Sequence, residues 1–145
     1  MPPKVAVYTT YQSDPYKVVA KLLEKVYSSG QRALVLCPDE KMATLDTTLW
    51  TYHPGSFLPH GMMTDAFPEN QPILLADKST KANNAAVLLI AGTTVPENVN
   101  EFEKIVWVVD GADTQAIALS EAWGRAYVGE VIYWRQTVDG QWQMA

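Results

Sequence analysis

The sequence predicts an α/β domain in three layers, with a mostly parallel sheet and helices on both faces. Apolar blocks of strand length, such as residues 32–37 and 85–91, alternate with segments whose apolar residues recur at helical spacing. Blocks without polar alternation are typical of strands covered on both faces of a parallel sheet. The 145 residues, 48% of them apolar, are expected to form a single domain over residues 1–145.

The first third of the chain has the clearest pattern. Residues 4–10 are rich in valine and tyrosine and predict a strand. Asp14 and Pro15 then give a helix-start signal, and Gly30 ends the helix. Residues 32–37 predict a buried second strand. The helix between them has apolar residues on one face and Lys17, Lys21 and Lys25 on the other, the apolar set being Val18, Val19, Leu22, Leu23, Val26 and Tyr27.

Asp39 is expected to cap a second helix, in which Met42, Leu45 and Leu49 share one face. Residues 61–71 contain Gly, Pro and Asn and predict a loop, before a strand at 72–77 and a polar turn at 78–84.

The last half predicts further alternation. A buried strand is expected at 85–91, a short helix at 96–103 and a strand at 104–109. Asp113 or Thr114 begins the last helix, and residues 131–135 predict an edge strand or tail extension. The expected apolar face of that helix is Ala116, Leu119, Ala122, Trp123 and Ala126.

Composition argues against several classes of function. A net charge of -5 and a pI near 4.9 argue against direct binding of nucleic acid. Cys37 is the only cysteine, so no internal disulfide is expected, and the start MPPKVAVY does not resemble a signal peptide. No apolar run approaches the roughly 20 residues that span a membrane. We expect a cytoplasmic protein that does not associate with membranes.

A nucleotide or other cofactor is not expected. The turn after the first strand, residues 9–14, contains no glycine that would let a phosphate approach the backbone. The eight glycines are scattered singly along the chain.

A small enzyme built around Cys37 and His60 is the alternative hypothesis. Cys37 ends a predicted strand, where open α/β sheets place their sites, and His60 follows later in the chain. A lone cysteine at the end of a buried strand is more often a small core residue, and the histidines lack metal-ligand spacing. Asp39 and Glu40 are better explained as helix-start residues than as acid and base catalysts.

An aromatic segment interrupted by prolines follows the second predicted helix. A loop cannot easily bury all of its large side chains, so we expect an exposed docking patch, with closure of the sheet edge by Trp50 and Phe57 as the alternative. The set comprises Trp50, Tyr52, Phe57, Leu58, Pro59, Met62, Met63 and Phe67.

Residues 33–60 resemble the chi subunit family of bacterial DNA polymerase III. The resemblance rests on Cys37-x-Asp39-Glu40, Leu45-Asp46, Leu49-Trp50, and Ser56, Phe57, Pro59 and His60. It implies a Rossmann-like fold without a nucleotide-binding loop, in a noncatalytic accessory subunit that pairs with the psi subunit of the clamp loader. By this likeness Trp50, Phe57, Pro59 and His60 would receive psi or a competing helicase.

The same resemblance implies a second site, for the acidic, phenylalanine-ended C-terminal tail of single-stranded DNA-binding protein. Val109, Trp123 and Arg125 would belong to it. Ser120 and Gly124 stand where the family has basic residues, so Arg125 or Arg135 would have to replace those cations.

Overall fold

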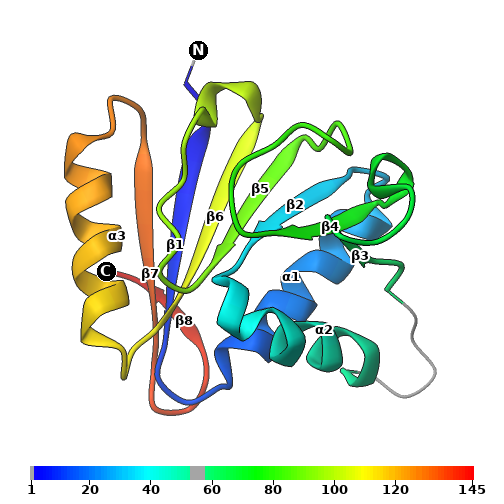
Figure 1. The fold of residues 1–145 in the computed structure, drawn as a ribbon. Helices are drawn as coiled ribbons and strands as arrows, with labels where there is room; N and C mark the ends of the chain where they lie inside the picture. The colour runs from blue at the N-terminus through cyan, green and yellow to red at the C-terminus, as the bar shows by residue number, and fades with distance from the viewer. Residues whose placement is uncertain (1, 53–57) are drawn as a thin grey trace.

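The computed structural model describes residues 2–52 and 58–145, and these residues form one eight-stranded sheet in the order β3-β4-β2-β5-β6-β1-β7-β8 (Figure 1). Every neighbouring pair is parallel except β7 with β8. The strands are β1 (Lys4–Thr10), β2 (Ala33–Leu36), β3 (Gly61–Met62), β4 (Ile73–Ala76), β5 (Val87–Ala91), β6 (Lys104–Asp110), β7 (Val131–Gln136) and β8 (Trp142–Met144).

Helices cover both faces of the sheet, which confirms the predicted α/β class. Helices α1 (Pro15–Ser28) and α2 (Met42–Thr51) pack on one face, and α3 (Thr114–Ala126) packs on the other (Figure 1). Asp14 and Asp113 cap α1 and α3, each accepting a hydrogen bond from a backbone N–H in the first turn. These are the start signals expected from the sequence.

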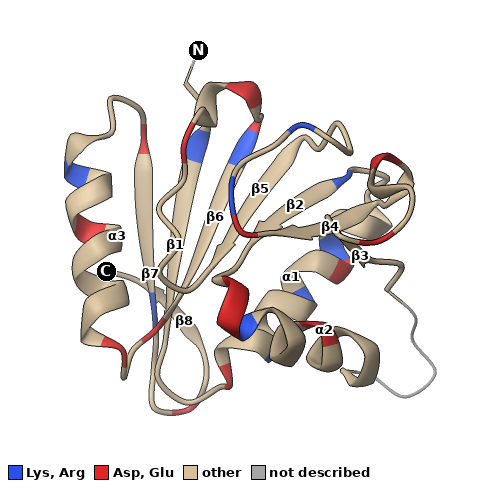
Figure 2. Cartoon of the chain, in the orientation of Figure 1, with Lys and Arg blue, Asp and Glu red and all other residues tan. Residues whose placement is uncertain are grey.

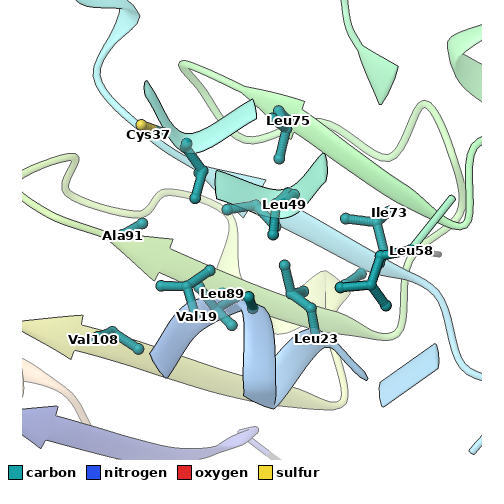
Figure 3. Packing of buried hydrophobic residues seen from close by; sticks show 14 of the residues in the cluster. Val19, Leu23, Cys37, Leu49, Leu58, Ile73, Leu75, Leu89, Ala91 and Val108 are labelled. Carbon is teal, nitrogen blue, oxygen red and sulfur yellow. The ribbon is translucent and has the colours of Figure 1, made fainter. Parts of the chain in front are cut away.

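The two core layers follow from side-chain alternation along the strands. In the layer under α1 and α2, Val19 and Leu23 of α1 meet Leu89 of β5, while Leu49 of α2 approaches Ile73 of β4 (Figure 3). In the layer under α3, Trp107 is fully buried, and its indole N–H donates to the carbonyl of Gly92 at 2.9 Å. Strands β2, β4 and β5 contribute to both layers, which explains their unbroken apolar sequences.

Several local predictions were wrong. Asp39 does not cap α2, because it lies inside a 3-10 turn, Asp39–Lys41, that precedes the helix. Predicted loop 61–71 contains β3 and a 3-10 turn at Pro68–Asn70. The helix expected at 96–103 is a single 3-10 turn, Val99–Glu101, since Asn98 before it adopts a left-handed φ of 53°.

The C-terminal region differs most from expectation. Strand β7 is not an edge strand, because it pairs with β1 on one side and with β8 on the other, and β8 was not predicted. The buried face of α3 also differs, with Ser120 buried while Ala122 and Ala126 are exposed.

In the described part of the chain, no helix combines the length and apolar character needed to cross a membrane.

Candidate partner-binding sites

The fully exposed residues of α2 are all uncharged. Its exposed residues are Ala43, Thr44, Thr47, Trp50 and Thr51, and Asp46, the single charged residue of the helix, is half-buried. The indole of Trp50 is 50% exposed. Figure 2 shows α2 almost entirely without charge, whereas α1 presents Lys17, Lys21 and Lys25 to solvent. A surface helix normally places charged residues on its outer face, so α2 has the composition of a helix that is covered by a partner.

The aromatic segment divides between core and surface. Leu58 is buried in the layer beneath α1 and α2, and Tyr52 and Met62 are half-buried against that layer. Trp50, Met63 and Phe67 remain exposed. Phe57 lies outside the described residues. The sequence pattern could not separate the side chains of this segment that complete the core from those that stay on the surface.

Pro59 and His60, which follow the exposed end of α2 in the chain, differ in burial. Pro59 is half-buried, while the His60 side chain has no exposed area. The Nδ1 atom of His60 lies 2.7 Å from the Leu58 carbonyl, and Nε2 lies 2.9 Å from Oδ1 of Asp46. The sequence analysis named Asp46 only as part of the family resemblance, and its contact with a residue fourteen positions later was not predicted.

A second candidate site is a pocket of about 350 Å³ between α3 and β7. It brings together Arg125 of α3 and Arg135 of β7, the two cations that the sequence offered as alternatives. Ile117, Ser120, Tyr133, Trp134 and Ala145 are among the other lining residues. Glu121 also lines the pocket, so the two guanidinium groups face one carboxylate. Burial raises the pKa of the Tyr133 hydroxyl, Glu121 raises it further and Arg125 opposes this.

Two residues expected at the second site, Val109 and Trp123, contribute to the core layer beneath α3 and not to the pocket wall. Val109 is fully buried in β6, and Trp123 stacks on Tyr127 with ring centroids 4.8 Å apart and contacts Trp107 edge-on. Neither lines the pocket.

The structure explains why Ser120 and Gly124 are small and uncharged. Ser120 is buried, and its hydroxyl donates to the Ile117 carbonyl. A Cβ atom on Gly124 would lie 2.1 Å from the Tyr133 hydroxyl, so a larger side chain cannot occupy this position without displacing the Tyr133 ring.

Cys37 and His60 have separate partners in the structure. Cys37 is buried at the end of β2 and hydrogen-bonds Tyr16, and burial raises the pKa of its thiol to about 11. A protonated thiol is a poor nucleophile at neutral pH. His60 is instead engaged by Asp46 and Leu58. Among the described residues, no three His, Cys, Asp or Glu side chains are grouped to hold a metal ion.

The cleft at the carboxyl ends of the strands, where open α/β sheets bind ligands, is acidic. It has a volume of about 530 Å³ and is lined by Asp14, Glu40, Asp110 and Asp113, with Lys41. Asp14 and Asp113 also occupy the N-termini of α1 and α3, whose N–H groups would otherwise be free for a phosphate. The cleft therefore disfavours nucleotides.

In the turn after β1, a possible anion site is filled by a side chain of the protein itself. The backbone N–H groups of Tyr11, Gln12 and Ser13 converge on one point, an arrangement that can bind an anion. In this chain the point is occupied by Oε1 of Gln136, at 3.1, 2.9 and 3.1 Å. Gln136 thus takes the place that a phosphate oxygen would need. Its contacts span more than 120 residues, so no sequence signal reveals them.

Comparison with known proteins gives one consistent family. A family model described as DNA polymerase III chi subunit, HolC, matches residues 3–128. A probable DNA polymerase III subunit chi from Rickettsia prowazekii is 33% identical over 113 residues, covering 72% of this chain and 68% of that protein. The DNA polymerase III subunit chi of Escherichia coli is 27% identical over 68% of each chain, and that of Pseudomonas aeruginosa is 24% identical over 73% of this chain and 76% of its own.

Proposed function

Because the chain belongs to the DNA polymerase III chi subunit family, we propose that it is a noncatalytic adaptor of the replicative polymerase. In this proposal it links the clamp loader, through psi, to the C-terminal tail of single-stranded DNA-binding protein. The chain contacts DNA through these partners rather than directly, as expected from its net charge of -5.

The observation that carries the proposal is the uncharged outer side of α2 with its exposed Trp50. Depletion of charge and an exposed tryptophan are typical of the centre of a protein interface, where aromatic residues supply much of the binding energy. We assign this surface to psi, with a helicase as a competitor for the same residues. Trp50 would be the central contact, Pro59 would lie beside it, and Phe57 is assigned by family resemblance.

The pocket between α3 and β7 supports the second half of the proposal. An acidic peptide that ends in phenylalanine needs a cation for its carboxylates and an apolar cavity for its ring. Arg125 and Arg135 supply two guanidinium groups, and Ile117 and Tyr133 supply apolar surface in the same pocket. The two arginines would replace the cations that Ser120 and Gly124 cannot provide. In this assignment Val109 and Trp123 support the pocket from the core.

The environments of Cys37 and His60, the two side chains that a catalytic hypothesis would use, support the proposal that the protein is noncatalytic. The Cys37 thiol is protonated because burial raises its pKa, and both ring nitrogens of His60 have partners. An enzyme that used this pair would need a thiolate near a histidine, and each residue is held by other groups.

The test of the first surface is a titration of the purified protein with a recombinant psi-family subunit from the source organism. We expect Trp50→Ala to weaken binding at least 30-fold, as for an interface hot spot costing about 2 kcal/mol or more. The matched control is Tyr27→Ala, which removes an exposed aromatic residue from α1. Equal affinities for wild type and Trp50→Ala would remove α2 from the interface.

The second surface is tested with a synthetic peptide of the C-terminal tail of single-stranded DNA-binding protein. Arg125→Ala and Arg135→Ala should each weaken peptide binding, by about 10-fold for the loss of one charge-assisted contact of about 1.5 kcal/mol. The charge-matched control is Lys21→Ala, on the exposed side of α1. If all three variants bind the peptide as the wild type does, the tail binds elsewhere or not at all.

A further inference from the structure

Two hydrogen bonds fix the imidazole of His60 in place. The Leu58 carbonyl can only accept, so Nδ1, at 2.7 Å, must carry a proton and donate. On the other side Nε2 lies 2.9 Å from Oδ1 of Asp46, a distance that requires a proton between the two atoms. With both ring nitrogens engaged and no exposed area, the ring has one orientation.

The fixed ring lies against the exposed indole of Trp50. The two ring centroids are 4.5 Å apart, with an angle of 48° between the ring planes. Asp46 and Trp50 are four residues apart on α2 and therefore lie on the same side of the helix, one turn apart. Asp46 therefore anchors the His60 ring, and that ring packs against Trp50.

We propose that His60 is a positioning residue for partner binding: Asp46 and Leu58 hold its imidazole, and the imidazole holds Trp50 in the orientation that receives the partner. This inference rests on the proposed psi-binding role of α2. It changes the expected role of His60 itself, which acts through Trp50 because its side chain has no surface for a partner to touch.

The physical basis is preorganisation. An exposed tryptophan without support samples several rotamers, and binding must then select one at a cost in conformational entropy. A ring packed against the indole before binding removes most of that cost. Removing the support should therefore weaken partner binding even though Trp50 itself is retained.

The test changes Asp46 rather than His60 or Trp50, so that the orientation of Trp50 can change while the Trp50 side chain is retained. Asp46→Ala removes the anchor, whereas Asp46→Asn retains it, because the side-chain amide can donate to Nε2 of a neutral imidazole. The protein is labelled with 5-fluorotryptophan, and the Trp50 fluorine resonance is assigned among the five tryptophans by its loss in Trp50→Phe. Asp77→Ala, an exposed carboxylate, controls for loss of charge.

We expect Asp46→Ala to shift and broaden the Trp50 resonance, with the other four unchanged, and to weaken binding of the psi-family subunit roughly 3- to 10-fold. Asp46→Asn should return both readings toward wild type, and Asp77→Ala should change neither. The inference is overturned if the Trp50 resonance is unchanged in Asp46→Ala, if it moves without loss of affinity, or if Asp46→Asn is as impaired as Asp46→Ala.

Failure of the proposed function gives a different result. If the wild type does not bind the psi-family subunit, α2 is not the psi surface, and this inference about partner binding is lost with it. If the wild type binds and Asp46→Ala binds equally well, psi binding stands and the positioning role of His60 does not.

Discussion

Replacing Gln136 with methionine should destabilise the protein by removing the group that ties β7 to the turn after β1. The side chain is 5% exposed, and its Oε1 accepts from three consecutive backbone N–H groups, those of Tyr11, Gln12 and Ser13. Its Nε2 also donates to the Ser13 hydroxyl at 2.8 Å. Methionine has a similar length and volume but cannot accept these bonds, so the change isolates the polar contribution.

The expected loss is about 3 kcal/mol in the free energy of unfolding, at about 1 kcal/mol for each of the three amide hydrogen bonds. A buried donor left without its acceptor costs about 1–3 kcal/mol. The lower end of that range applies because Tyr11, Gln12 and Ser13 are themselves exposed, so water can replace part of the lost acceptor. Urea unfolding of wild type and variant measures the difference. Amide hydrogen exchange gives a local reading, since the three N–H groups should lose protection.

Gln143→Met is the matched control, because Gln143 is an exposed glutamine on the neighbouring strand β8. It should leave stability within about 0.5 kcal/mol of wild type, as for most surface changes. Gln136→Glu should keep most of the stability, since a carboxylate accepts the same three N–H groups. A Gln136→Met protein as stable as the control would refute the structural role of this contact.

Three further changes test other parts of the fold. Gly124→Ala should cost about 1–3 kcal/mol of stability through the clash with the Tyr133 hydroxyl, and in a Tyr133→Phe background it should be neutral or stabilising by up to about 1 kcal/mol, measured by urea unfolding. Asn83→Ala should destabilise by about 2–3 kcal/mol, because the buried amide donates to two backbone carbonyls, and thermal unfolding will show the loss. Cys37 should react with iodoacetamide at pH 8 only after denaturation. The pKa of its thiol rises from 9.0 to about 11 on folding, so its contribution to stability is present below about pH 9 and is lost between pH 9 and 11, a dependence that Cys37→Ala should reduce in pH-dependent urea unfolding.

Local pattern was enough for the elements with strong signals. Strand β1 and helix α1 were predicted because a valine-rich block, an Asp-Pro start and apolar residues at helical spacing all agree. Strand β8 was missed because Trp142–Met144 is short and has no signal beyond two apolar residues. The order of strands, and hence the interior place of β7, depends on pairing between distant segments, which a single sequence does not contain.

For the candidate sites too, the sequence predicted local features but not the contacts between distant residues. The exposure of Trp50 was expected because large apolar residues crowd around the end of α2, more than a loop can bury. The support of Trp50 by His60 and the meeting of Arg125 with Arg135 depend on the fold. A histidine in an irregular segment predicts neither burial nor exposure, so its role could be assigned only once its two hydrogen bonds were known.

The position of the two candidate surfaces on the sheet has a consequence for how an adaptor would behave. Helix α2 lies toward the edge formed by β3 and β4, and the arginine pocket lies beside β7 (Figure 1). Five strand-to-strand steps separate β4 from β7, about 24 Å at about 4.8 Å per step. Two ligands at this separation need not exclude each other, so in the proposed function the chain would act as a bivalent connector. Within an assembled replisome the second contact then occurs at high effective concentration. A variant that weakens one site tenfold with isolated components should therefore show a smaller defect when both partners are present.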